Sequence, residues 1–83
     1  MKSRRDMRKL KTALLAGAAG TRFYSGDLRQ AASLHNARLY PLLVLFEQRG
    51  WITNGWDEPE AGEDQPRPWY VLTDLGRREM TRP

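Results

Sequence analysis

The stretch ARLYPLLVLFEQRGWI, from Ala37 to Ile52, decides how this chain folds, because as a helix it is apolar on almost every side. Helices of that kind occur inside large proteins or across membranes. A chain of 83 residues builds one domain with a modest core. None of its apolar runs approaches the roughly 20 residues that span a bilayer. Other parts of the chain, or a second subunit, must therefore cover this helix.

Composition excludes several classes of site. There is no cysteine, which removes disulfides, thiolate metal sites and a cysteine nucleophile. The single histidine, His35, cannot build a histidine metal cluster and has no acid or nucleophile partner beside it. We therefore expect no enzyme, no metal and no cofactor. The short apolar tract near the N-terminus favours a cytoplasmic protein without a membrane segment.

The net charge of +4 is unevenly distributed along the chain. Residues 1–29 hold eight basic and two acidic residues, whereas residues 57–66 hold five acids and no base. This polarity is typical of a face that binds a polyanion and an opposite edge that is repelled from it. Charges that merely solvate a small domain would give the same pattern, so charge alone leaves both interpretations open.

Hydrophobic spacing predicts two helices before the quoted stretch. Apolar residues recur at helical spacing over about residues 4–19, and this first helix is strongly basic at its start and ends at Gly20. Phe23 follows in a short extended segment. Ser25 is the expected N-cap of a second helix, which runs to about Ser33.

The quoted stretch itself forms the third helix. Ser33, His35 or Asn36 is its expected cap, and Gly50 ends it. Two helices separated by a few residues, with the second one capped and followed by a glycine, are typical of a helix-turn-helix.

After the third helix the pattern changes to strands. Residues 51–56 (WITNGW) and 66–73 (PRPWYVLT) are rich in β-forming side chains, and the polar stretch between them suits a hairpin tip. A short final helix follows at residues 74–80, capped by Thr73 or Asp74. We expect its Leu75 and Met80 to return to the core.

This order predicts an α+β winged helix-turn-helix: three helices, a two-stranded β-hairpin wing and a short C-terminal helix. We expect a single domain over residues 1–83, with the wing at residues 51–72.

The sequence resembles the PadR-like winged-helix transcriptional regulators. That family's pattern is leucine-tyrosine-proline, two spaced leucines, a polar turn with glycine and isoleucine, a wing, an aromatic strand and a threonine-x-x-glycine-arginine helix. The leucine-tyrosine-proline motif and the threonine-x-x-glycine-arginine motif are each weak evidence alone. Both motifs at the right separation around a wing are hard to obtain by accident. The likeness covers about residues 14–80, and the matching residues are Leu39, Tyr40, Pro41, Leu43, Glu47, Gly50, Ile52, Tyr70, Leu72, Thr73, Gly76 and Arg77.

The resemblance implies a sequence-specific DNA-binding regulator, with repression as the expected effect and double-stranded DNA as the partner. In helix-turn-helix proteins the N-terminal end of the recognition helix enters the major groove. Arg38 can donate two hydrogen bonds to guanine, and Asn36 can pair with adenine or donate to a phosphate. The resemblance places the hydroxyl of Tyr40 near the DNA backbone. Arg38 has the strongest case, since no acid lies at helical spacing to pair with it.

Each of these residues also has a purely structural interpretation. Asn36 serves equally well as a helix cap, Tyr40 as a packing residue, and His35 as a plain turn residue rather than a phosphate contact. In the wing, Arg67 lies between two prolines where the hairpin returns, well placed for phosphate or the minor groove. Arg22 is a further phosphate contact or a solvated charge. The acids before Arg67 indicate that the wing tip points away from DNA.

Three departures separate the chain from the family's usual pattern. Ser25, Gly26, Asp27 and Leu28 stand where relatives carry glycine-tyrosine-glutamate and a hydrophobic residue, so an aromatic is lost or replaced by a neighbouring Phe23 or Tyr24. Val44 and Leu45 are apolar where relatives are mostly basic or polar. The chain also ends at Pro83, which indicates a short form without the family's C-terminal dimerisation helix.

We nevertheless expect a homodimer. Leu42, Val44 and Leu45 lie off the stripe of Leu39, Leu43 and Phe46, and a helix of the same chain or a second subunit must cover them. Candidate interface residues are Met7, Leu10, Leu14, Leu15, Leu42, Leu45 and Met80. A winged helix that binds a protein instead of DNA is the alternative function.

Overall fold

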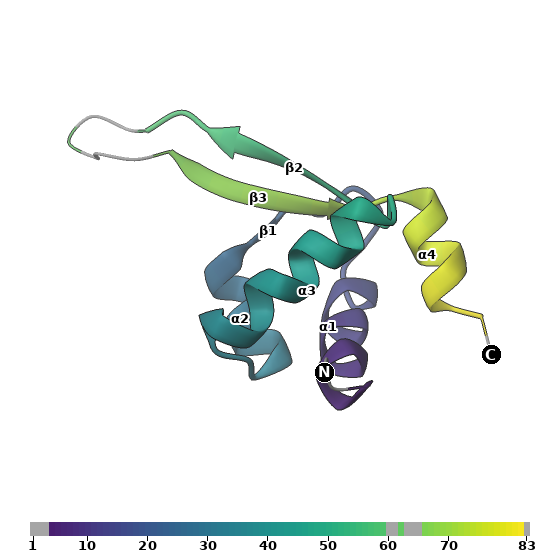
Figure 1. Cartoon of the computed structure of the whole chain (residues 1–83). Helices are drawn as coiled ribbons and strands as arrows, with labels where there is room; N and C mark the ends of the chain where they lie inside the picture. The colour runs from purple at the N-terminus through teal and green to yellow at the C-terminus, as the bar shows by residue number, and fades with distance from the viewer. Residues whose placement is uncertain (1–3, 60–61, 63–65, 83) are drawn as a thin grey trace.

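Four helices and three strands form a winged helix-turn-helix in the computed structural model, which describes residues 4–59, 62 and 66–82 (Figure 1). This confirms the predicted fold class. Along the chain the elements are α1 (Arg4–Leu15), β1 (Phe23–Tyr24), α2 (Ser25–Ala32), α3 (Asn36–Gln48), β2 (Ile52–Asp57), β3 (Arg67–Leu72) and α4 (Asp74–Met80).

Helix α1 is shorter than the sequence predicted, since it ends at Leu15 instead of about residue 19. A side chain at Gly17 would meet the ring of Phe23 at 2.6 Å, so the chain after α1 passes directly against β1. The hydroxyl of Thr21 donates to the carbonyl of Ala18 at 2.7 Å and closes a turn there. Glycine is a poor helix former, and this local turn competes successfully with a longer helix.

The sheet has three strands, where the sequence predicted a two-stranded hairpin. Its strand order is β1-β3-β2, and all pairs are antiparallel. Phe23 pairs with Tyr70 and Tyr24 with Trp69. The expected extended segment at Phe23 is thus a short edge strand that pairs with β3. It anchors the wing to the start of α2.

The helix-turn-helix forms as predicted, with one change at its caps. Tyr24, not Ser25, is the N-cap of α2, and its N–H donates to the carboxylate of Asp27 at 3.1 Å. Ser33 ends α2 in the left-handed conformation with φ 55°. His35 is the N-cap of α3, one of the three residues that the sequence offered.

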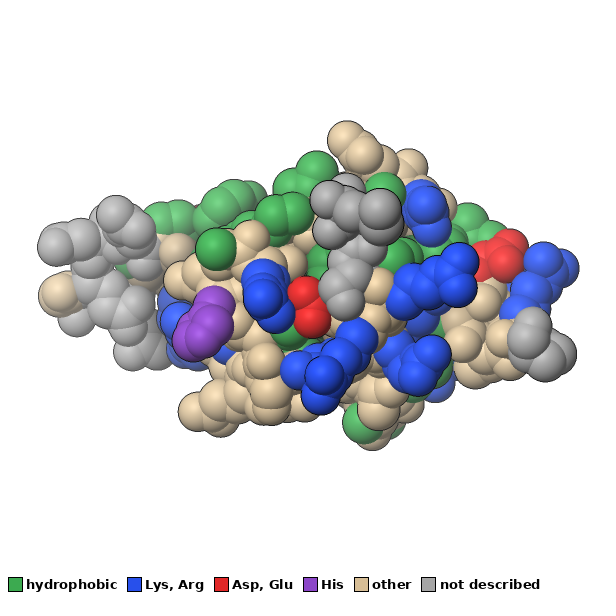
Figure 2. All heavy atoms as spheres, turned by 60° about the horizontal axis from the view of Figure 1, so that its bottom comes forward, with side chains coloured by type: hydrophobic (Ala, Val, Ile, Leu, Met, Phe, Trp, Pro, Cys, Tyr) green, Lys and Arg blue, Asp and Glu red, His purple; other side chains and the backbone are tan. Residues whose placement is uncertain are grey.

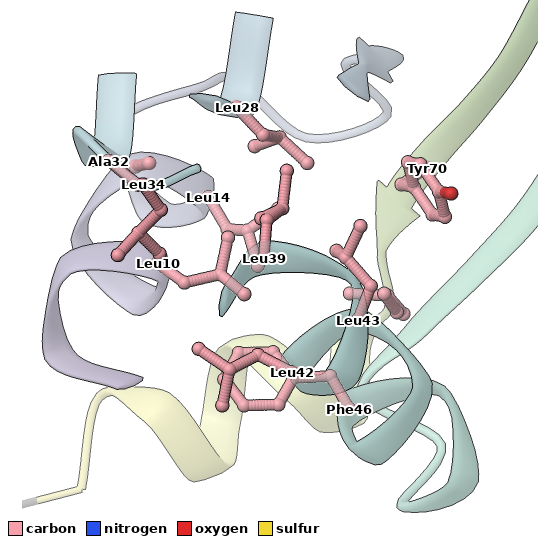
Figure 3. Packing of buried hydrophobic residues seen from close by; sticks show 12 residues of the cluster. Leu10, Leu14, Leu28, Ala32, Leu34, Leu39, Leu42, Leu43, Phe46 and Tyr70 are labelled. Carbon is pink, nitrogen blue, oxygen red and sulfur yellow. The ribbon is translucent and has the colours of Figure 1, made fainter. Parts of the chain in front are cut away.

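Helix α3 lies at the centre of the fold, which answers how so apolar a helix is covered (Figure 3). Leu39, Leu43 and Phe46 are buried as their spacing predicted, and Leu42 is buried with them. The chain supplies the cover itself, from α1, α2, the turn between α2 and α3, and the sheet, through Leu10, Ala13, Leu14, Leu28, Ala32, Leu34, Ile52 and Tyr70. Only part of the helix remains in solvent, where Val44 is 53% exposed and Leu45 is half-buried.

This packing corrects part of the expected dimer interface. Leu10, Leu14 and Leu42 are at most 2% exposed in the single chain, so they are core residues and offer no surface to a second subunit. Periodicity alone did not distinguish these roles, because a core stripe and an interface stripe have the same spacing.

Helix α4 is fixed by the threonine-x-x-glycine-arginine motif. The N–H of Gly76 donates to the hydroxyl oxygen of Thr73 at 2.9 Å, and that hydroxyl donates to the carbonyl of Gly50 at 2.7 Å. A Cβ at Gly76 would lie 2.2 Å from the carbonyl oxygen of Trp51. Arg77 donates to the carbonyl of Gly17 at 3.2 Å. The motif thus connects α4 to the end of α3 and to the segment after α1.

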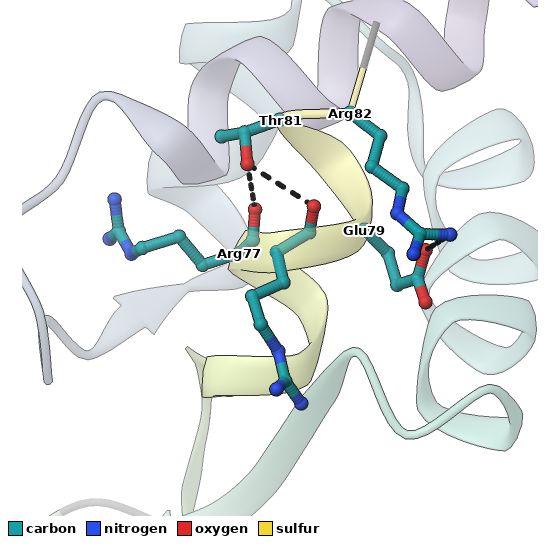
Figure 4. A network of polar contacts seen from close by, with 5 residues as sticks. Arg77, Glu79, Thr81 and Arg82 are labelled. Carbon is teal, nitrogen blue, oxygen red and sulfur yellow. Dashed lines mark hydrogen bonds and ion pairs between the residues drawn. The ribbon is translucent and has the colours of Figure 1, made fainter.

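The end of α4 is closed by its own polar contacts (Figure 4). The hydroxyl of Thr81 donates to the carbonyl of Arg77 at 2.8 Å, and Arg82 pairs with Glu79 at 3.4 Å. Met80 packs against the core as expected, whereas Leu75 is 39% exposed, so the expectation that Leu75 returns to the core is wrong.

Candidate nucleic-acid interface

The N-terminal end of α3 projects polar side chains into solvent. His35, Asn36, Arg38 and Tyr40 are all exposed, although Tyr40 retains only 40% of its exposure. Asn36 and Tyr40 are four residues apart and therefore share one face of the helix. The first turn of α3 carries no acid, so the partial positive charge at this end of the helix is not neutralised within that turn.

Arg38 lies on a different side of α3, toward α1. Its guanidinium is 3.7 Å from the carboxylate of Asp6, whereas its side chain remains 67% exposed. No acid lies at helical spacing from Arg38, as the sequence indicated, but an acid from another helix pairs with it instead. Sequence separation hid this pair, since only residues three or four apart on one helix can be matched by spacing.

A shallow hollow lies between α2 and the start of α3. It brings His35 and Asn36 next to Arg29, an exposed residue that the sequence reasoning had not selected. A basic side chain on the outer face of the helix before the turn was the available signal. The hollow is lined by Gly26, Asp27, Arg29, Gln30, Ser33, Leu34, His35, Asn36 and Ala37.

Near the outer end of the paired strands of the wing, Arg22 and Arg67 each lie over an aromatic ring, in a group that we call the wing cluster: Arg22, Tyr24, Asp57, Arg67 and Trp69. The guanidinium of Arg22 is 4.4 Å from the ring centroid of Trp69, and that of Arg67 is 4.2 Å from that of Tyr24. Cation–π contacts of this kind are worth about 0.5–1 kcal/mol at exposed sites. They hold two exposed, flexible cations on the outer side of the sheet.

Asp57 connects these groups. Its carboxylate accepts a hydrogen bond from the hydroxyl of Tyr24 and lies 3.7 Å from the guanidinium of Arg22. The hydrogen bond to Asp57, together with desolvation, raises the pKa of Tyr24 above 10.0. Tyr24 and Asp57 come from opposite edges of the sheet, so they join β1 to β2 across β3.

Trp69 completes the wing cluster, and its position requires a glycine at position 55. The ring of Trp69 covers its strand partner Gly55, where an added Cβ would meet the ring at 2.1 Å. Sequence reasoning selected both arginines but missed Tyr24, Asp57 and Trp69. The pairing of β1 with β3, which brings Tyr24 beside Trp69, could not be predicted from so short a strand.

Lys and Arg side chains gather on the face of the molecule seen in Figure 2, which is the lower side of Figure 1 where α1 begins. Exposed arginines come from α1, α2 and α3, namely Arg4, Arg5, Arg8, Arg29 and Arg38. No cluster of three or more potential metal-ligating side chains occurs in the part of the chain that the structure describes. Among those same residues, no helix has the length and apolar character needed to cross a membrane.

The Transcriptional regulator PadR-like family model matches residues 25–82, which contain both halves of the helix-turn-helix, the wing and α4. The chain belongs to this family. It is therefore a transcriptional regulator of the PadR-like type, and the family supports DNA as its partner. No curated protein matches the chain.

Solved structures agree with the family. A PadR-like transcription factor from Bacteroides fragilis is 26% identical, with a TM-score of 0.70 over 93% of this chain and 76% of that one. The protein smu.1704 from Streptococcus mutans UA159 is 23% identical, with a TM-score of 0.71 over 96% and 76% of the two chains. The circadian clock associated protein Pex from Anabaena is 22% identical, with a TM-score of 0.68 over 92% and 68%. The last two support the fold alone.

Proposed function

We propose that this PadR-like regulator binds double-stranded DNA sequence-specifically, with the N-terminal end of α3 in the major groove, and that it represses transcription. The observation that carries the proposal is the exposed, acid-free start of α3, where Asn36 and Tyr40 share one face and arginines flank them. Helix N-termini favour anions through unpaired N–H groups and the helix dipole.

Within this proposal the residues of α3 have different tasks. Asn36 is at the first helical position, where its amide reaches adenine or a phosphate, and Tyr40 donates its hydroxyl to the backbone on the same side. Arg38 exchanges Asp6 for the O6 and N7 atoms of a guanine, since a guanidinium at 67% exposure is free to swing outward. His35 and Arg29 contact phosphate beside the turn.

The wing supplies the second contact of the proposed complex. Stacking over Tyr24 and Trp69 restricts the guanidinium groups of Arg67 and Arg22 before DNA arrives, which lowers the entropic cost of binding phosphate. The acidic residues at positions 60, 63 and 64 lie outside the described residues, and the expectation that this tip points away from DNA stays a prediction.

We further propose that the protein acts as a homodimer in the cytoplasm. One recognition helix occupies one groove, and pairs of such modules on a palindrome give regulatory affinity. The interface candidates that keep accessible surface in the single chain are Met7, Leu15, Leu45 and Met80.

A gel-shift assay against the DNA upstream of the protein's own gene tests the function. Specific retention that random duplex does not compete away supports the proposal, and a steep loss of affinity with salt identifies the phosphate contacts. The alternative is a winged helix that binds a protein through α3, favoured by the exposure of Val44 at 53% beside Tyr40. Absence of any duplex binding at low salt would favour that alternative.

A further inference from the structure

We propose that a basic groove between α1 and the end of α2 binds the DNA backbone beside the bases that α3 contacts. This inference rests on the proposed function and extends the contact surface beyond the helix-turn-helix and the wing. The groove is lined by Arg5, Arg8, Lys9, Thr12, Ala31, Ala32 and Ser33.

The charge of this groove is of one sign. Three of its lining residues are basic and none is acidic. Arg8 and Lys9 follow Arg5 by three and four residues, so each lies beside Arg5 on α1 and repels it. Like charges at this spacing destabilise an isolated helix. A helix face that only needs solvation avoids this cost by mixing signs, whereas a polyanion offsets it.

The lining of the groove suits a phosphate backbone. Besides the basic residues it includes Ala31 and Ala32, whose side chains are small, and Thr12 and Ser33, which carry hydroxyls. Hydroxyl, Lys and Arg donors are the groups that bind phosphate oxygens in DNA complexes. From Arg5 to Thr12 the helix advances by about 10 Å, which corresponds to about three nucleotides at 3.4 Å each.

The groove is continuous with the proposed DNA-contacting surface at the start of α3, which favours DNA as its ligand. Ser33 lines both this groove and the hollow beside the start of α3, so the two surfaces meet at the turn of the helix-turn-helix. The ion pair of Asp6 with Arg38 also joins α1 to the start of α3. A backbone that passes the turn therefore reaches α1 without leaving the protein surface, as the basic face in Figure 2 suggests.

The test compares two double variants that remove the same charge from different places. Arg8→Gln with Lys9→Gln changes the groove, whereas Arg49→Gln with Arg78→Gln removes two cations that line neither hollow. Binding of each full-length protein to a random-sequence duplex is measured between about 50 and 200 mM salt. Thermal melting confirms that both variants fold.

We expect the groove variant to flatten the plot of log affinity against log salt by about 2, at roughly 0.9 for each lost phosphate contact. The control variant should keep the slope of the unmodified protein. Equal slopes for the groove variant and the unmodified protein, or equal losses in both variants, would overturn the groove while leaving the proposed function intact. Failure of the unmodified protein to bind any duplex would instead refute the proposed function, and the groove with it.

Discussion

At the residue scale, Arg38 is the side chain whose role the structure changes most. It is both the best candidate to read a base and the partner of Asp6 at 3.7 Å. The Arg38 side chain is 67% exposed, whereas the side chain of Asp6 is only 12% exposed. The pair therefore holds Arg38 near the start of α3, and the exposed guanidinium can still turn toward a guanine, where a bidentate contact is worth roughly 1–3 kcal/mol.

We predict that Arg38→Ala lowers affinity for the specific site by about 1–3 kcal/mol and relaxes the base choice at one position of each half-site. Competition gel shifts with single-base operator variants measure both effects. Asp6→Asn is the matched control, since it removes the ion pair but keeps the guanidinium. Unchanged selectivity in folded Arg38→Ala would exclude a reading role.

Arg67 should behave differently, because a wing cation that binds phosphate carries no sequence information. We predict that Arg67→Ala weakens specific and random duplexes similarly and lowers the salt slope by about one. Affinity titrations over a salt series measure this change. A loss confined to the specific site would show that the wing reads bases.

Tyr24 makes the stability of the wing cluster depend on alkaline pH. The hydrogen bond to Asp57 raises its pKa above 10.0 in the folded chain, so the protonated phenol is favoured by folding. The contribution of this hydrogen bond to stability is fully present below the pKa of Tyr24 in the unfolded chain. It is lost as the pH rises through the pKa of Tyr24 in the folded chain. We predict that Tyr24→Phe destabilises the protein at pH 7 but has less effect above pH 10. Urea melts at both pH values decide this, and an equal loss at both would contradict it.

At the element scale, sequence could predict what local patterns encode. Helix α3 and its stripe of Leu39, Leu43 and Phe46 follow from periodicity, and the cap at Thr73 follows from residue type. The early end of α1 could not be predicted from local patterns, because it depends on the tertiary contact of Gly17 with Phe23. Strand β1 has two residues, too few for an alternating pattern, and its pairing depends on β3.

The same limit applies to the candidate site. Residue type and position along α3 selected Asn36 and Tyr40, and both are exposed as expected. The pair of Arg38 with Asp6 and the contacts of Tyr24 with Asp57 join residues far apart in the sequence, which no spacing rule reaches. The sequence thus predicted which side chains are exposed at the candidate interface, but not the tertiary contacts that position them.

We predict that Gly76→Ala destabilises the fold, although alanine normally favours a helix by about 1 kcal/mol over glycine. The added Cβ would lie 2.2 Å from the carbonyl oxygen of Trp51, which is backbone and cannot move away freely. We expect a loss of about 1–3 kcal/mol, as in other overpacked sites. Gly26→Ala in α2 is the control, since its nearest contact is the mobile end of Arg29 at 3.4 Å. Equal stability of the two variants by urea denaturation would contradict this account of the motif.

At the scale of the whole molecule, the single chain already covers most of its apolar surface. The apolar stripe of helix α3 is covered by α1, α2 and the sheet of the same chain, so no second subunit is needed to bury Leu42. The proposed dimer must therefore be driven by less surface than the sequence indicated. Among the original candidates, Leu15 at the end of α1 and Leu45 on α3 keep partial exposure on different elements.

The last prediction concerns this dimer, which two recognition helices on a palindrome require. We expect sedimentation at micromolar concentration to show a dimer, and Leu15→Asp to shift it to monomer by placing a charge in the interface. Leu10→Asp, although on the same helix, is no test of assembly, because Leu10 is 0% exposed and a buried charge there would unfold the chain. Thermal melting must therefore show that Leu15→Asp stays folded. A monomer without any substitution would refute the dimer. A dimer that survives Leu15→Asp would instead place the interface at the other candidates with accessible surface, Met7, Leu45 and Met80.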